Sequence, residues 1–235
     1  ILIIGGSKGI GLHLAKNLKE NHSVYITYNN NQLRDKNVFK KSFHLDLNDI
    51  STFNSFINNL DENIDVIIFN AAINQRSDFL KMKVNEYDNI LNINLKSYVF
   101  FIQNLEKRKR IKKNMRLIFM SSVASEYYGP KTLHYMLSKV GINGLVKFLA
   151  QRYSNKNIYV NAISPGLILT DQTRSEFESG AAEKLINKTL LKKPGDLDSV
   201  LSAVEFLISP KNNYLTGQVI SLSGGAILWE IQFWF

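Results

Sequence analysis

Tyr135 and Lys139 lie four residues apart in the segment LHYMLSKVGINGL, whose periodicity predicts a helix. Residues at this separation lie on one face of an α-helix. A free tyrosine hydroxyl titrates at about pH 10, which is too high for easy proton exchange at neutral pH. A cation one turn away favours the phenolate and lowers the pKa of the tyrosine. The pair therefore predicts a site that exchanges a proton with a substrate oxygen.

Ser122 precedes Tyr135 by 13 residues and follows the apolar run RLIFMS. A tyrosine and a lysine at this spacing also occur together by chance, so the pair alone decides little. A serine delivered by the end of a strand could hydrogen-bond the same substrate oxygen as the tyrosine. The three residues together favour the catalytic interpretation.

Glycines gather at the start of the chain, where Gly5, Gly6, Gly9 and Gly11 follow the apolar run Ile1–Ile4 and open a helical pattern. Between a strand and a helix, glycines permit a tight turn and close approach of the backbone to a pyrophosphate. The helix N-terminus adds free N–H groups and a favourable dipole. Glycines needed only for the turn and for packing are the alternative, but the placement after the first strand favours a dinucleotide site.

The end of the second predicted strand bears on the choice of dinucleotide. NAD sites use an acidic residue there, which binds the ribose 2′-hydroxyl. This chain has Thr27, Tyr28 and Asn29 at that point, and no carboxylate precedes Asp35. Lys8, inside the glycine loop, could instead meet a 2′-phosphate. We predict NADP(H) as the preferred cofactor, with NAD(H) as the alternative if Lys8 is merely solvated.

Short apolar runs alternate with longer segments of helical period along the chain. The predicted strands are Ile1–Ile4, Val24–Tyr28, Ser42–Leu45, Val66–Phe69, Arg116–Ser121, Ile158–Ser164 and Gln218–Leu222. The predicted helices are Gly9–Glu20, Ile50–Asn59, Val84–Arg108, Leu133–Tyr153 and Asp196–Ile208. Helices between successive strands imply right-handed crossovers and a parallel sheet. We therefore predict one doubly wound α/β (Rossmann) domain over residues 1–235, with a parallel seven-stranded sheet and helices on both faces. Residues 171–191 are predicted to form a loop with a short helix that covers the site.

Composition excludes several classes of protein. The chain has no cysteine, so disulfides and cysteine-based metal sites are excluded, and its histidines show no metal-ligand spacing. No apolar run is long enough to span a membrane. The net charge of +9 would suit a nucleic-acid or membrane-surface protein, but the lysines are spread along the chain without a nucleic-acid motif. We predict a cytoplasmic protein that binds neither nucleic acid, membrane nor metal, with an acidic protein partner left open.

The order of the motifs resembles the short-chain dehydrogenase/reductase family over nearly the whole chain. The motifs are Gly5-x-x-x-Gly9-Ile10-Gly11, FNAA (69–72), Ser122, Tyr135-x-x-x-Lys139 and SPG (164–166). The segments ISPGLILT and YLTGQVISLSGG are most similar to the branch of 3-oxoacyl-carrier-protein reductases. Four positions depart from the family pattern and affect loop geometry rather than catalytic groups: Ile4, Phe69, Ala72 and Ser223 stand where the family has Thr, Asn, Gly and Asp.

The resemblance implies a role for residues along the whole chain. It implies a catalytic set of Asn94, Ser122, Tyr135 and Lys139, in which Asn94 holds a water that links Lys139 to solvent. It implies that the cofactor is bound by Gly5, Ser7, Lys8, Gly9, Ile10, Gly11, Asp46, Leu47, Asn70, Ala71, Ala72, Tyr135, Lys139, Pro165, Gly166, Ile168 and Thr170. Within this set, Asp46 would bond the adenine amino group, and Ile168 and Thr170 would hold the nicotinamide carboxamide.

The reaction that the resemblance implies is NADPH-dependent reduction of a ketone to a secondary alcohol, with Tyr135 as proton donor. The first choice of substrate is a 3-oxoacyl thioester on a carrier protein. A keto-sugar or another small carbonyl compound is the alternative, and a non-enzymatic redox sensor or scaffold is a further one. The resemblance also implies a homotetramer, packed through the helices that carry Asn94 and Tyr135.

Three surface features allow more than one interpretation. The basic segment EKRKRIKKNMR (106–116) could be a solvated helix end, a nucleic-acid contact or a docking site for an acidic carrier. Docking of a carrier is considered because this segment precedes the strand that delivers Ser122, and Lys113 and Lys156 are the residues to test for it. Tyr127 and Tyr128 could line the substrate pocket or pack in their loop. The aromatic tail ILWEIQFWF could pack against a partner subunit.

Overall fold

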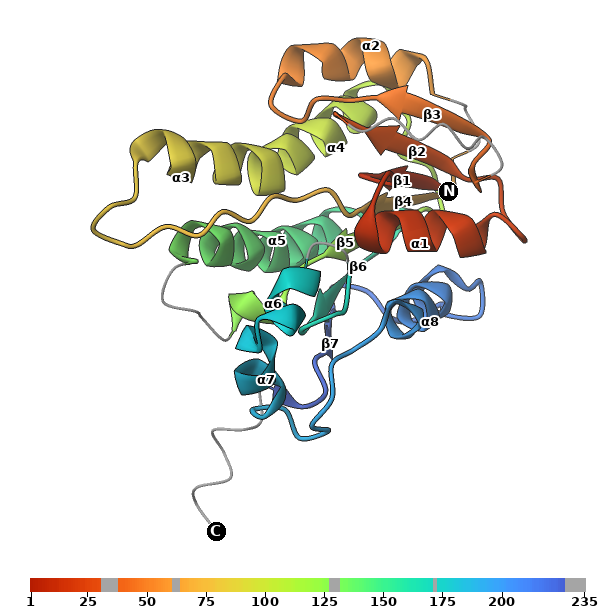
Figure 1. Cartoon of the computed structure of the whole chain (residues 1–235). Coiled ribbons are helices and arrows are strands. Elements are labelled where there is room, and N and C mark those ends of the chain that lie inside the picture. The colour runs from red at the N-terminus through yellow and green to blue at the C-terminus, as the bar shows by residue number, and fades with distance from the viewer. Residues whose placement is uncertain (31–37, 61–63, 127–131, 171–172, 227–235) are drawn as a thin grey trace.

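The computed structural model describes residues 1–30, 38–60, 64–126, 132–170 and 173–226 (Figure 1). Its sheet consists of β1 (Leu2–Ile4), β2 (Tyr25–Tyr28), β3 (Lys41–His44), β4 (Val66–Phe69), β5 (Arg116–Met120), β6 (Tyr159–Pro165) and β7 (Val219–Leu222). The strand order is β3-β2-β1-β4-β5-β6-β7, and every neighbouring pair is parallel. The predicted fold class is confirmed, and each strand end lies within one residue of the predicted one.

Helices cover both faces of the sheet (Figure 1). On one face lie α2 (Phe53–Asn58), α4 (Ser97–Lys107) and α5 (Leu133–Arg152), and on the other lie α1 (Gly9–Leu18) and α8 (Leu197–Ile208). Side chains of a strand point alternately to the two faces. In β4, Ile67 and Phe69 accordingly join the core under α4 and α5, whereas Val66 and Ile68 join the core under α1 and α8. Burial of both faces explains why these strands are apolar throughout.

The prediction of one continuous helix over Val84–Arg108 is wrong. The chain forms α3 (Val84–Leu91), then a π-helical turn η3 (Asn92–Lys96), and then α4. The wider turn lets two consecutive side chains face α5: Asn94 donates to the hydroxyl oxygen of Ser138 at 3.2 Å, and Leu95 packs on Gly141. Periodicity did not reveal the turn, because apolar residues continue through it.

Shorter elements complete the described chain. Three 3-10 turns are η2 (Ile50–Thr52), η4 (Val123–Ser125) and η5 (Ser154–Lys156), and η2 forms the first turn of the predicted helix Ile50–Asn59. Two short helices, α6 (Arg174–Glu178) and α7 (Ala181–Ile186), occupy the predicted loop over residues 171–191, where one helix was expected. In Figure 1 they lie beside α5, near the ends of the strands.

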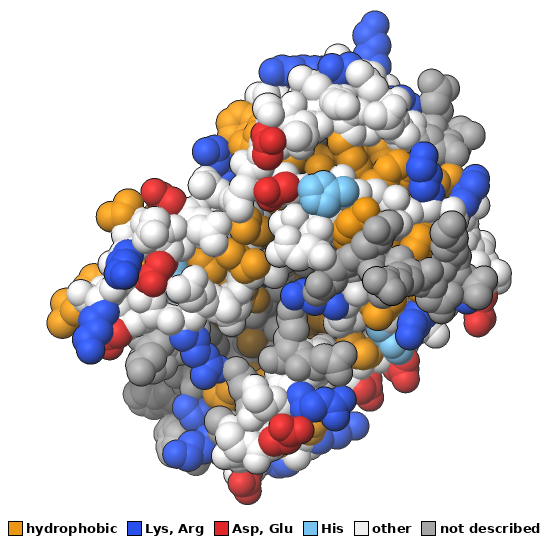
Figure 2. Space-filling view, turned by 45° about the horizontal axis from the view of Figure 1, so that its top comes forward, with side chains coloured by type: hydrophobic (Ala, Val, Ile, Leu, Met, Phe, Trp, Pro, Cys, Tyr) orange, Lys and Arg blue, Asp and Glu red, His pale blue; other side chains and the backbone are white. Residues whose placement is uncertain are grey.

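Charge is dispersed over the surface. On the face seen in Figure 2, lysine and arginine side chains lie at several separate places, with acidic side chains between some of them. Among the described helices, none has both the length and the apolar character needed to cross a membrane.

Candidate active site

All seven strands run in one direction, so their carboxyl ends share one edge of the sheet. Predicted site residues follow five of these ends: Gly5 after β1, Asp46 after β3, Asn70 after β4, Ser122 after β5 and Gly166 after β6. The strand order reverses between β1 and β4, and open α/β sheets bind ligands at such a reversal. The fold therefore brings motifs that are distant in sequence to one edge.

The glycine turn after β1 is held from two sides. The Gly5 N–H donates to the Thr27 hydroxyl at 3.0 Å, and the Gly6 N–H donates to the Thr27 carbonyl at 2.9 Å. The Asn70 amide donates to the Gly5 carbonyl at 2.7 Å. A Cβ on Gly5, whose φ is +82°, would stand 2.6 Å from the Ala71 Cβ, so only glycine fits. The role of Thr27 as acceptor for the glycine turn was not predicted, since a threonine at a strand end carries no distinguishing signal.

The start of α1 suits a diphosphate. Gly9 has φ +52°, and a Cβ placed on it would have no atom within 4 Å, so the backbone there borders open space. The Lys8 side chain precedes the helix and makes no capping hydrogen bond to it. First-turn N–H groups and the positive end of the dipole therefore face the loop, which is the arrangement that binds phosphate. These residues fit the predicted dinucleotide.

The other predicted residues of the glycine loop differ in exposure. Lys8 is exposed, and Ser7 is partly buried. Ile10 is partly buried against the core under α1 and α8. Gly11 packs the helix onto the turn, because a Cβ on it would lie 2.1 Å from the Gly5 carbonyl oxygen. Only the lysine of this group extends a charge into solvent.

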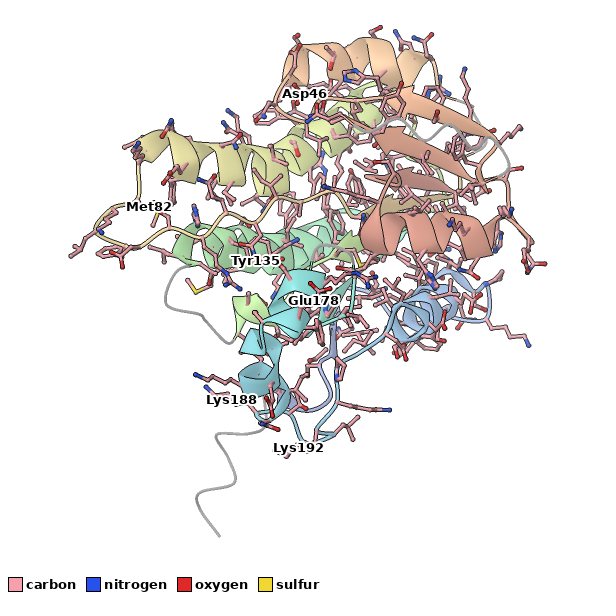
Figure 3. All side chains as sticks on the ribbon, in the orientation of Figure 1. Asp46, Met82, Tyr135, Glu178, Lys188 and Lys192 are labelled. Atoms are coloured by element: carbon pink, nitrogen blue, oxygen red, sulfur yellow. The ribbon has the colours of Figure 1, made fainter. Side chains whose placement is uncertain are left out.

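Asp46 and Leu47 follow β3 at the far end of the edge. The Asp46 carboxylate accepts a hydrogen bond from the Asn48 N–H at 2.9 Å, and the carboxylate stays partly exposed. Leu47 is only 6 % exposed and belongs to the core under α4 and α5. Figure 3 shows Asp46 near the start of α2 and Tyr135 on α5, well apart from each other. An extended ligand could span this separation.

The loop after β4 is fixed by two side chains from the helices beneath it. The Tyr98 hydroxyl donates to the Ala71 carbonyl. Asn94, which is fully buried, accepts from the Ile73 N–H and donates to the Ile73 carbonyl, both at 2.9 Å. Asn70, Ala71 and Ala72 are thus held partly buried at the edge. This clamp was not predicted from the sequence, and the water-holding role of Asn94 stays a prediction.

Ser122, Tyr135 and Lys139 lie close together, as predicted. The pKa of Tyr135, however, is raised rather than lowered. Burial raises the pKa of Tyr135, and the side-chain hydrogen bond from Ser122 lowers it by a smaller amount. Lys139 is buried, which lowers its pKa to about 8, and its ammonium donates to the Met120 carbonyl at 2.7 Å. The expected lowering of the Tyr135 pKa by Lys139 is therefore not found, because burial disfavours both charges and the ammonium bonds a carbonyl.

The segment after β6 forms a closed turn. Pro165 ends the strand in the core, and the N–H of Gly166 donates to the Leu222 carbonyl at 2.9 Å. The Thr173 hydroxyl donates to the Ile168 carbonyl at 2.7 Å and accepts from the Thr170 N–H at 2.9 Å. Ile168 is 5 % exposed and packs in the core, so its side chain is not free for a ligand. Backbone groups are what this turn can offer to a carboxamide.

Lys113 and Lys156 lie away from this edge. The Asn114 N–H donates to the Lys156 carbonyl at 3.4 Å, so the two lysines belong to neighbouring loops. These loops precede β5 and β6, at the amino ends of the strands, whereas Ser122 follows β5. The two lysines therefore lie at the opposite end of β5 from Ser122, and their role in docking a carrier stays a prediction.

The remaining predicted features concern two tyrosines, the C-terminal tail and the histidines. Tyr127, Tyr128 and the tail 227–235 lie outside the described residues. Over the described ranges, no group of three or more His, Asp or Glu side chains is placed to hold a metal ion. His134 is buried beside Tyr135, and its Nδ1 accepts from the Tyr135 N–H at 3.1 Å.

Comparisons with known proteins agree with this geometry. A family model described as Enoyl-(Acyl carrier protein) reductase matches residues 5–226. The 3-oxoacyl-[acyl-carrier-protein] reductase FabG of Rickettsia felis is 31% identical over 234 residues, covering 97% of this chain and 96% of the relative. The structure of 3-oxoacyl-[acyl-carrier protein] reductase from Brucella melitensis in complex with NAD has a TM-score of 0.87 at 28% identity, covering 97% and 96% of the two chains. ElxO with NADP bound has a TM-score of 0.86 at 27% identity, covering 97% and 98%.

Proposed function

Since this chain belongs to the short-chain dehydrogenase/reductase family, we propose that it reduces a ketone to a secondary alcohol with NADPH. Family membership makes it an NAD(P)-dependent oxidoreductase of C=O and CH–OH groups. The observation that carries the finer proposal is the interaction of the Ser122 side chain with the Tyr135 phenol, which acts to lower the pKa of that phenol, beside the buried ammonium of Lys139. A serine hydroxyl and a phenol that can both reach one substrate oxygen suit a reaction in which that oxygen gains a proton.

Each of these side chains acts on the substrate oxygen in a different way. When bound, NADPH supplies a hydride to the carbonyl carbon. The Ser122 hydroxyl donates a hydrogen bond to the carbonyl oxygen, and the Tyr135 hydroxyl gives that oxygen its proton. The Lys139 cation stabilises the phenolate that remains. A water at Asn94 would then return a proton to Tyr135 through Lys139.

The preference for NADPH rests on the end of β2 and on Lys8. Tyr28 and Asn29 carry no carboxylate that could bind a ribose 2′-hydroxyl. Lys8 is exposed beside the open glycine turn, where an ammonium can meet a 2′-phosphate. Both observations support NADPH over NADH, and NADH remains the alternative cofactor.

For the substrate, we propose a 3-oxoacyl thioester, carried by an acyl carrier protein. The support is the printed function of relatives such as FabG of Rickettsia felis, which matches this chain over nearly its full length. The alternative substrate is a keto-sugar or other small carbonyl compound. The alternative function is non-enzymatic sensing of redox state. Because the matching family model is described as an enoyl reductase, enoyl thioesters belong in the substrate panel.

We also propose that the protein is a homotetramer, assembled partly through α4 and α5. Large apolar side chains are exposed on these helices: Val99 is 38%, Val140 45% and Phe148 58% exposed. Their burial against another subunit would remove this surface from water. Sedimentation of the purified protein at several concentrations tests the proposal, and a monomer at all of them would contradict it.

Tyr135→Phe tests the reaction. We expect it to lower kcat by about 10²- to 10⁴-fold, the usual contribution of a general acid, without changing the melting temperature appreciably. Oxidation of NADPH is followed over a panel of 3-oxoacyl thioesters, enoyl thioesters and keto-sugars. Tyr153→Phe is the matched control, because it removes another buried tyrosine hydroxyl, close to the end of α5. Unchanged turnover of every accepted carbonyl by Tyr135→Phe would refute the assignment.

A further inference from the structure

A chain of hydrogen bonds lies behind Ser122 and connects it to a residue on α5 that no motif includes. The Ser121 hydroxyl donates to the Asn143 side-chain oxygen at 2.6 Å. The Asn143 amide donates to the Ser125 hydroxyl oxygen at 2.9 Å. The Ser125 hydroxyl in turn donates to the Ser122 carbonyl at 2.8 Å. We propose that Asn143 and Ser125 are positioning residues, which hold the Ser122 turn in the geometry that the reaction requires.

The position of Asn143 on α5 makes this connection direct. It follows Lys139 by four residues and Tyr135 by eight, so the three side chains lie along one face of the helix. One helix therefore carries the proton donor, the cation and the support of the serine. Movement of the Ser122 turn relative to α5 would break the hydrogen bonds to Asn143. These bonds therefore help to set the distance between Ser122 and Tyr135.

The turn itself leaves the Ser122 hydroxyl free to donate. Ser122 precedes η4 in an extended conformation, and its hydroxyl oxygen accepts from the Ala124 N–H at 3.1 Å. A hydroxyl has one proton, and this bond leaves that proton available. Ser125, at the other end of η4, fixes the Ser122 carbonyl. Both ends of the short turn are thus tied, and the hydroxyl is directed at the phenol.

The direction of the bonds gives an isosteric test. Each serine hydroxyl has one proton, so Ser125 can donate to the Ser122 carbonyl only while its other partner is a donor and does not compete for that proton. The Asn143 amide is that donor. An aspartate at this position has the same shape but, when ionised, only accepts. The Ser125 proton would turn to the carboxylate, and the Ser122 carbonyl would lose its partner.

The experiment compares Asn143→Asp, Ser125→Ala and Ser125→Thr, with kcat, KM for NADPH and the pH profile of alcohol oxidation as readouts. For the first two we expect kcat to fall about tenfold with KM for NADPH within about twofold, because positioning affects the transition state more than binding. The pH at which Tyr135 loses its proton should move upward, since a misplaced Ser122 no longer stabilises the phenolate. Ser125→Thr keeps the hydroxyl and should restore both kcat and the profile.

Ser122→Ala separates this inference from the proposed function on which it rests. If Ser122→Ala is inactive while Ser125→Ala and Asn143→Asp keep wild-type kcat and pH profile, the positioning role is refuted and the proposed reaction stands. If Ser122→Ala retains full turnover, the proposed reaction fails and the positioning role with it. Ser125→Ala removes one hydroxyl from a partly buried turn, so it decides the question even if Asn143→Asp does not fold.

Discussion

The ammonium nitrogen of Lys139 lies 5.5 Å from the centre of the Tyr135 ring. Proximity of this kind is expected to favour the phenolate. Burial works against it, because it raises the pKa of Tyr135 and lowers that of Lys139 to about 8. The site therefore holds two groups whose charged forms are both destabilised by the fold. Shifts of this kind are typical of functional sites.

Removing the buried charge should make the fold more stable while it removes activity. The fall in the Lys139 pKa from 10.5 to about 8 costs the charged form at most about 3 kcal/mol. Lys139→Met leaves the Met120 carbonyl unpaired, which offsets about 1–3 kcal/mol of the gain. We expect a net gain of up to about 2 kcal/mol at pH 7, measured by urea denaturation, with kcat reduced at least about hundredfold.

The pH dependence distinguishes this cause from better packing. Between pH 8 and 10.5 the unfolded chain keeps the Lys139 proton and the folded chain has released it. The free energy of unfolding of the wild type should therefore rise with pH in this window, relative to Lys139→Met. Lys147→Met, an exposed lysine on the same helix, should follow the wild type. Parallel curves for wild type and Lys139→Met would contradict the explanation.

Reversing the charge of Lys8 should change the choice of cofactor. A glutamate in the glycine loop would repel a 2′-phosphate and could accept a hydrogen bond from a ribose hydroxyl. We expect Lys8→Glu to lower the ratio of kcat/KM for NADPH to that for NADH by at least about tenfold, or about 1.4 kcal/mol. Lys16→Glu, on the exposed side of α1, is the control for overall charge. An unchanged ratio would end the assignment of Lys8 to the phosphate.

Tyr98→Phe should loosen the loop after β4. It keeps the ring, which packs 4.9 Å from the ring of Phe69, and removes the hydroxyl that bonds the Ala71 carbonyl. An unpaired buried carbonyl costs about 1–3 kcal/mol, so the melting temperature should fall. We expect KM for NADPH to rise about three- to tenfold with a smaller change in kcat. Equal KM values for the variant and the wild type would show that the bond does not position the cofactor loop.

The contact between α4 and α5 should weaken in acid. Arg152 donates two hydrogen bonds to the Glu106 carboxylate, at 2.9 and 3.0 Å, and Tyr153 donates a third at 3.0 Å. The guanidinium and the phenol hold the pKa of Glu106 below its ordinary value of 4.5. The stabilisation is therefore present above that pH and is lost as the pH falls through the lowered value.

Glu106→Gln should remove this dependence. The wild type should be more stable than the variant at neutral pH, and the two unfolding curves should converge as the pH is lowered below about 4. Glu205→Gln, an exposed site on α8, serves as the control and should follow the wild type throughout. A constant difference between wild type and Glu106→Gln across the range would mean that packing, not charge, explains the effect.

The sequence predicted the central strands well because they are short apolar runs buried on both faces, as Val66–Phe69 shows, whereas the edge strands β3 and β7 are more exposed. It also predicted which motifs meet, since the ends of parallel strands share an edge. Thr27, Tyr98 and Asn143 escaped prediction because their partners are distant in sequence and follow no local pattern. The direction of the Tyr135 pKa escaped for a different reason, namely that spacing reveals neighbours but not depth of burial.

The π-helical turn η3 makes the number of residues between α3 and α4 critical. Its hydrogen bonds run over five residues rather than four, so Asn92–Lys96 accommodates one residue that a continuous α-helix would not. Deleting one codon here would restore a regular helix and give it better local geometry. The same deletion would turn α3 by about 100° relative to α4 and remove Asn94 from Ile73. Loss of one residue in this segment should therefore be less well tolerated than loss of one residue in an exposed loop, although it would make the helix locally more regular.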